Sequence, residues 1–243
     1  MQADWLINYV NDRIARIAEG PFFQFIAGVT DRSGLFWVHQ LAHMSRGVIQ
    51  ALLLRASRCG RRDGREGDVL FLEPSLRHAV EEAMHPIDLE RWARVFDIAG
   101  TPGRPAFCGV AKTSQTERLL DHLWLIAEQG SGEEQVVVLN MVTEGVALAF
   151  YSAALETLRR LGMSTGRYWG AHKEADAGHA LLGADLVHVD EGSDAGSRLL
   201  GMASVTLDLF EQMLSSWVPE AFVASPPEIA RGLAVGHGRE ASP

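Results

Sequence analysis

Apolar residues recur along the chain at spacings of three and four positions, the period of a helix that buries one face. No segment shows the sustained alternation of apolar and polar residues that is typical of a strand. The pattern predicts an all-α bundle of about seven helices, with Pro86 kinking or ending the short one. The expected helical ranges are 4–19, 33–56, 74–85, 88–98, 114–128, 133–161, 167–187 and 197–217.

Length and composition predict one domain. The chain has 243 residues, of which 47% are hydrophobic, enough for one substantial core. We expect a helical domain over residues 1–222 and a tail of loop composition over 223–243. The cysteines Cys59 and Cys108 lie far apart without CxxC spacing, so we expect two reduced bystanders.

The net charge and the N-terminal pattern disfavour nucleic acid and membranes as partners. A net charge of -9 offers no basic surface for nucleic acid, and no strongly basic amphipathic helix suits an anionic membrane. Polar residues interrupt the N-terminal apolar stretch, which predicts neither a signal peptide nor a membrane span. We therefore expect a cytoplasmic protein that binds a small molecule.

Three polar residues occupy the core-facing stripe of the range 167–187. His172, Asp176 and His179 fall within about 60° of arc on a regular helix. Burying a carboxylate beside two imidazoles is costly unless each is paired, and a divalent metal compensates all three. The alternative is a hydrogen-bonded Asp/His pair that joins two helices.

Two other predicted helices also place ionisable residues on faces that are otherwise apolar. Glu144 is the one acid on an apolar face that includes Met141, Leu148 and Tyr151. It could also pair with an arginine or reach an edge of the bundle. Glu82 and His85 have the E-x-x-H spacing, which brings a carboxylate and an imidazole together on one helix face.

Together these residues provide six ligands for two metal ions. The set is Glu82, His85, Glu144, His172, Asp176 and His179. Mixed carboxylate and imidazole ligation suits iron or manganese, and the lack of cysteine ligands disfavours structural zinc. The range 33–56 contains no acidic residue, which disfavours a ferritin-like set of four carboxylates.

The motifs resemble those of the haem-oxygenase-like dimetal oxidases, which bind two irons instead of haem. The stretch "HKEADAGH" fits the H-x-x-x-D-x-x-H pattern of that family, and Glu144 fits its isolated glutamate. "EGPFFQFIAG" and "HPIDLERWARVFDIAG" are also similar to family segments. The resemblance covers residues 20–186 and implies a single-domain haem-oxygenase-like fold.

The chain departs from this family at one ligand position. Most members place a glutamate seven residues before the histidine, where this chain has His78, whereas others use the E-x-x-H spacing. Glu82, Glu81 and His78 can all reach the His85 face of a regular helix. We favour Glu82, which gives three carboxylates for two metals, and keep Glu81 and His78 as alternatives.

The resemblance implies two Fe(II) ions, with manganese an alternative at one site, and O2 as co-substrate. It implies an oxidase or oxygenase of specialised metabolism that performs N-oxygenation, desaturation or carbon-carbon cleavage. We expect a small carboxylate-bearing substrate such as an amino-acid derivative. The resemblance also allows an external electron donor and a homodimer.

Candidate substrate contacts come from two places. Arg46 and His43 belong to a polar stripe that could face the site, with Arg46 binding a carboxylate, or could face solvent. Tyr168 and Trp169 begin the helix that carries the ligands, so they could wall the pocket or be plain core.

Two other classes of protein stay open. The first is a haem-binding or metal-free enzyme of the same fold, of the thiamin-degrading or quinone-cofactor kind, with His39 or His43 as the haem ligand. The second is a non-catalytic helical protein that binds or stores metal.

Overall fold

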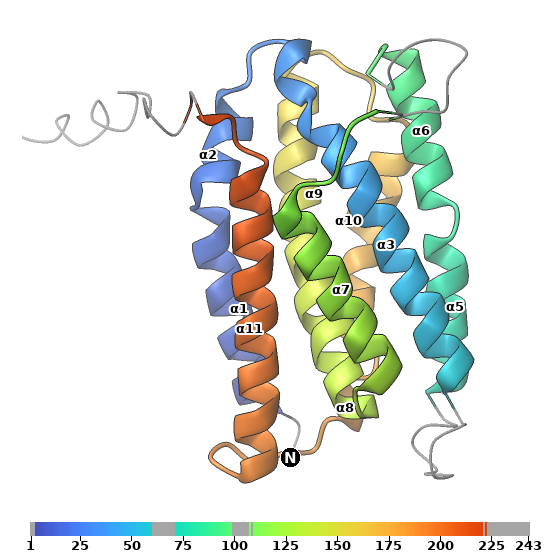
Figure 1. The fold of residues 1–243 in the computed structure, drawn as a ribbon, viewed down its shortest axis with the longest axis vertical. Coiled ribbons are helices and arrows are strands. Elements are labelled where there is room, and N and C mark those ends of the chain that lie inside the picture. The colour runs from blue at the N-terminus through green and yellow to red at the C-terminus, as the bar shows by residue number, and fades with distance from the viewer. Residues whose placement is uncertain (1–2, 60–70, 99–106, 108, 221, 223–243) are drawn as a thin grey trace, which may run out of the picture.

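The computed structural model describes residues 3–59, 71–98, 107, 109–220 and 222, and not the side chains of 171 and 173–177. Over these residues the chain is a helical bundle without strands, so the all-α prediction is confirmed (Figure 1). Cys108 and the expected tail over 223–243 lie outside the described residues. The first half comprises α1 Asp4–Ala18, α2 Pro21–Gly28, the short 3-10 helix η1 Arg32–Leu35, α3 Trp37–Arg58, α5 Leu72–Glu82 and α6 His85–Val95.

The second half begins with α7, Ser114–Gln129. One continuous helix follows, composed of α8 Gly132–Gln135, the π-helical segment η2 Val136–Val142 and α9 Thr143–Arg160. The remaining elements are α10 Gly166–Ala180, the 3-10 helix η3 Ala184–Leu186 and α11 Asp194–Ser216. There are more pieces than the eight expected ranges, because α2, η1 and η3 are separate elements and the predicted range 133–161 comprises α8, η2 and α9.

Helix α9 lies in the middle of the bundle. It contacts α1, α2 and α10, while α3 packs on α5, α6 and α7, and α11 packs on α1 and α7. In Figure 1, α1 and α11 stand at one side, and α5 and α6 at the other. An aromatic cluster fills the space between them, with Phe22 stacked on Phe150 at a centroid distance of 5.7 Å and Trp37 edge-on to both.

The stretch Gly132–Arg160 is long and apolar enough to cross a membrane, with a mean hydropathy of 1.6 over its most apolar window. However, 67% of that window is buried inside the bundle. This burial is typical of the core helix of a bundle.

The break between α5 and α6 falls earlier than predicted. The expected helix continued to His85 and was kinked or ended by Pro86, but α5 ends at Glu82 and α6 begins at His85. Pro86 therefore lies in the first turn of α6, where its missing N–H leaves no hydrogen bond unmade. Glu82 and His85 consequently face one another across the junction of two helices.

Helix α10 also ends earlier than predicted, at Ala180 rather than at Val187. Gly183 follows with φ +79, and a Cβ added there would lie 2.6 Å from Phe71. Glycine alone tolerates both this left-handed backbone and the close packing, so it turns the chain away from the bundle axis.

Candidate metal centre

Four helices bring the acidic and imidazole side chains together. α5 carries His78, Glu81 and Glu82, and α6 begins with His85. α9 carries Glu144, and α10 carries His172 and His179. The structure thus brings together Glu82, His85, Glu144, His172 and His179, and adds His78.

The first cluster consists of Glu82, His85 and His172. Their ligand atoms lie within 4.8 Å of one another, and all three residues are buried. Glu82 Oε2 is 2.5 Å from His85 Nδ1, and the rings of His85 and His172 are 3.9 Å apart at their centroids. One carboxylate and two imidazoles in this arrangement could hold a divalent cation.

The second cluster consists of His78, Glu144 and His179, whose ligand atoms also lie within 4.8 Å of one another. His78 Nε2 is 3.2 Å from Glu144 Oε1. The two clusters are adjacent, since His179 Nδ1 lies 3.4 Å from Glu82 Oε1. Glu82 therefore lies between the two clusters, in contact with His85 and His179.

A carboxylate outside the clusters holds His179. Glu81 Oε2 accepts a hydrogen bond at 2.8 Å from His179 Nε2, and the Glu81 side chain is half exposed. Metal-binding histidines usually donate their second N–H to a carboxylate or carbonyl in this way. Glu81 thus contacts the candidate ligand His179 but does not itself belong to either cluster.

Arg55 is fully buried behind the second cluster. Its guanidinium donates to Asn140 Oδ1 at 2.5 Å and lies 3.2 Å from His78 Nδ1. Asn140 belongs to the π-helical segment, and its Nδ2 donates to the carbonyl of His179 at 3.0 Å. The wider turn of a π-helix often occurs at functional sites, and here it carries the residue that links α3 to α10.

Several buried polar atoms of the two clusters lack an aligned hydrogen bond. They are His78 Nε2, Glu82 Oε1 and His179 Nδ1. Buried polar groups are rarely left in this state because each costs free energy. Metal ions in the two clusters would satisfy Glu82 Oε1 and His179 Nδ1, so the donor set fits a pair of divalent cations.

Burial and neighbouring charges shift the pKa values of these groups. Burial lowers the pKa of His78 to about 3, helped by the nearby Arg55, and burial lowers the pKa of His172 to about 3. Burial opposes ionisation of Glu82, but its contacts with His179 and His85 outweigh this and lower its pKa. Burial lowers the pKa of His179, but contacts with Glu82 and Glu81 outweigh it, so the pKa is raised. Glu82 is thus a carboxylate, and His78 and His172 are neutral, as metal binding requires.

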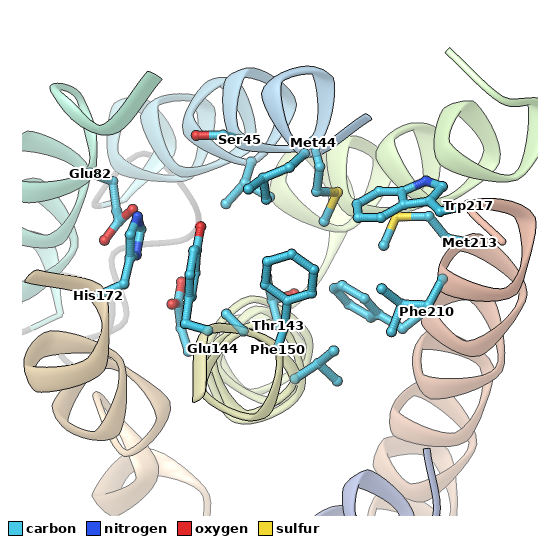
Figure 2. Close-up of a pocket in the computed structure, with 16 residues that line it drawn as sticks. Met44, Ser45, Glu82, Thr143, Glu144, Phe150, His172, Phe210, Met213 and Trp217 are labelled. Carbon is cyan, nitrogen blue, oxygen red and sulfur yellow. The ribbon is translucent and has the colours of Figure 1, made fainter. Parts of the chain in front are cut away.

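A cavity opens from the first cluster toward α11 (Figure 2). Glu82, His172 and Glu144 lie at one end, and Phe210, Met213 and Trp217 at the other. Its volume is about 70 Å³, and because one water needs roughly 10–15 Å³ on this measure, several waters or a slender group can enter. The lining is Leu41, Met44, Ser45, Val48, Glu82, Thr143, Glu144, Val146, Ala147, Phe150, Tyr151, His172, Phe210, Met213, Leu214 and Trp217.

The other candidate residues lie outside the cavity lining. Arg46 is on an exposed part of α3, and His43 Nε2 bonds to the carbonyl of Val110 at 2.8 Å. Trp169 is buried against Trp37 and Trp92, and Tyr168 bonds to the hydroxyl of Tyr151 at 2.7 Å. Asp176 lies on α10, but its side chain is outside the described ones, so its role as a ligand stays a prediction.

Sequence reasoning missed Arg55 and Asn140. Each is a single polar residue within an apolar run, "ALLLRAS" and "VVVLNMV" respectively. That signal, a lone polar residue on a buried face, is the one that pointed to Glu144. It also missed the cavity residues of α11, which look like ordinary core positions.

Comparison with solved structures identifies the fold. A TenA homolog from Pseudomonas syringae pv. tomato superposes with a TM-score of 0.70 at 15% identity, covering 89% of this chain and 92% of the other. A domain of unknown function with a heme oxygenase-like fold from Shewanella denitrificans gives 0.70 at 17% identity, covering 94% and 97%. Comparisons with protein families and with curated proteins give no match. The chain therefore has a haem-oxygenase-like fold, as expected from the sequence.

Proposed function

We propose that this protein is a non-haem dimetal oxidase or oxygenase that uses O2. The observation that carries the proposal is the pair of adjacent Glu/His clusters at one end of a largely apolar cavity. Glu82, His85 and His172 would hold one ion, and Glu144 and His179 would hold the other, together with Asp176. Two ferrous ions there would supply electrons to O2, with manganese an alternative at one position.

The chain's own residues would control access and orientation. Tyr151 stacks on His172 at a centroid distance of 3.9 Å and lines the cavity, so it would fix the plane of that imidazole. Phe150, Phe210 and Trp217 would keep bulk water from the reacting group. Glu81 would hold His179 in the orientation that points Nδ1 toward the centre.

The cavity also restricts the substrate. Its described lining contains no lysine or arginine. A carboxylate-bearing substrate, such as an amino-acid derivative, would therefore place its charged group near the metals and its apolar part toward Met44 and Met213. The reaction would be N-oxygenation, desaturation or carbon-carbon cleavage of such a molecule.

The alternative is a haem-binding or metal-free enzyme of the same fold, and it stays open because this chain is structurally similar to a TenA homolog. Neither His43 nor His39, the candidate haem ligands, lines the cavity. The two buried Glu/His clusters favour the dimetal function over these alternatives and over plain metal storage.

The test uses His172→Ala and Asp176→Ala, with O2 consumption and iron content as readouts. The proposal predicts that both variants lose turnover and bind less iron while keeping their helical circular dichroism. Full activity in either variant would overturn the assignment of that residue, and iron binding without O2 consumption would favour storage. An external electron donor, a homodimer and a cytoplasmic location remain predictions from the sequence.

A further inference from the structure

His78 differs from the other histidines of the clusters because one ring nitrogen faces hydrogen-bond donors and the other faces a carboxylate. We infer that His78 is a positioning residue that holds Glu144, and that it is not a metal ligand. The inference rests on the proposed dimetal centre. It removes His78 from the three residues, Glu82, Glu81 and His78, that the sequence leaves open as the ligand from α5.

Among the described residues, the Nδ1 side of the ring faces hydrogen-bond donors and no acceptor. Arg55 lies 3.2 Å from Nδ1, and Asn140 Nδ2 lies 3.4 Å from it. A guanidinium cannot accept a hydrogen bond. The amide of Asn140 is fixed in this orientation, because its oxygen accepts from Arg55 and its nitrogen donates to the carbonyl of His179. Nδ1 therefore accepts, and the proton of the neutral ring is on Nε2.

That tautomer is the wrong one for an ordinary metal ligand. A histidine that binds metal through Nε2 carries its proton on Nδ1 and donates it to an acceptor. His179 meets the equivalent requirement, since Nε2 bonds to Glu81 and Nδ1 points to the centre. His78 has no such acceptor among its described neighbours, and the charge of Arg55 on the Nδ1 side of the ring would disfavour a cation bound directly to Nε2.

The Nε2 side of the ring faces Glu144. Nε2 lies 3.2 Å from Oε1, close enough for a hydrogen bond but not aligned for one. The terminal torsion of a glutamate side chain is broad, so a small rotation of the carboxylate completes the bond. His78 then fixes Oε1 of Glu144, with Arg55 and Asn140 holding the ring.

The experiment compares His78→Gln with His179→Gln, a matched substitution of a ligand. Glutamine at position 78 can accept from Arg55 through its oxygen and donate to Glu144 through its nitrogen. His78→Leu can do neither. Each protein is loaded anaerobically with Fe(II) for metal analysis and with Co(II) for visible spectroscopy, after circular dichroism has shown a folded chain. His78→Asn replaces any variant of His78 that does not fold.

We expect His78→Gln to keep the wild-type metal content of about two per chain and His179→Gln to lose about one. His78→Leu should keep the metal content but shift the Co(II) absorption bands, because Glu144 loses its donor. Loss of one metal by His78→Gln, or unshifted bands in His78→Leu, would overturn the inference. Wild-type protein that binds no metal would instead overturn the proposed function on which it rests.

Discussion

Tyr151 lies flat against His172, with ring centroids 3.9 Å apart and planes within 8° of each other. The two residues belong to α9 and α10, so the stack joins the central helix to the helix that supplies three candidate ligands. The Tyr151 hydroxyl is held in turn by the hydroxyl of Tyr168 at 2.7 Å. The imidazole plane of His172 is therefore set by packing as well as by its own backbone.

Removing this stack should weaken metal binding. In Tyr151→Leu the imidazole of His172 can rotate, and we expect the metal affinity to fall about 10–100-fold, as for other residues that orient ligands. Tyr151→Phe keeps the ring and is the control, with affinity close to wild type. Competition with a coloured chelator measures both variants, and equal affinity in Tyr151→Leu and Tyr151→Phe would show that the stack has no such role.

Arg55 should be essential for stability. In Arg55→Met, Asn140 Oδ1 and His78 Nδ1 lose their buried donor, and we expect the free energy of unfolding to fall by about 2–4 kcal/mol. Urea denaturation of the metal-free protein measures the change. The control is Arg46→Met on the exposed face of the same helix, for which a change within about 0.5 kcal/mol is expected. Equal losses in the two variants would contradict the assigned role of Arg55.

Acid should destabilise the metal-free protein through its buried histidines. Burial lowers the pKa of His78 and of His172 to about 3, whereas the unfolded chain titrates near 6.5. Between these values the unfolded state binds more protons, so stability falls as the pH falls, by up to about 1.4 kcal/mol per pH unit for each histidine. His179, whose pKa is raised, acts in the opposite sense, because its contribution is lost as the pH rises.

The contribution of His78 can be isolated with His78→Gln. As the pH is lowered from 7 to 5, the free energy of unfolding of the wild type should fall by more than that of His78→Gln. Urea denaturation at each pH measures it. A difference that does not change with pH would mean that His78 is readily protonated in the folded state.

The far end of the cavity should decide which apolar groups fit. Met213→Trp adds bulk between Phe210 and Trp217, and we expect binding of hexanoate, a slender carboxylate used as the probe, to weaken by about 10-fold or more while metal content is unchanged. Val205→Ala, on an exposed face of the same helix, is the control. Isothermal titration with the metal-loaded protein measures both, and unchanged affinity in Met213→Trp would place the ligand elsewhere.

The sequence predicted the fold and the gathering of the candidate ligands for one physical reason. His172, His179 and Glu144 interrupt apolar stripes, and helix geometry then requires their side chains to point into the bundle. Periodicity carries no information about partners across helices. The contact of Glu81 with His179 and the contact of Arg55 with His78 depend on how α3, α5 and α10 pack, and could not be predicted from spacing.

The positions of two helix ends were also predicted incorrectly. Pro86 was expected to end a helix, yet proline is equally suited to a first turn, and the choice depends on the packing of α6 against α3 and α10. The early end of α10 depends on Phe71, which lies more than one hundred residues away in the chain and packs against Gly183.

The central claim is that the two Glu/His clusters hold a pair of metal ions. The most direct test is a crystal structure of the protein loaded anaerobically with Fe(II), with anomalous diffraction recorded at the iron edge. The account predicts about two iron peaks per chain, one bound by Glu82, His85 and His172 and the other by Glu144 and His179. Well-ordered crystals without an iron peak at either cluster would contradict it.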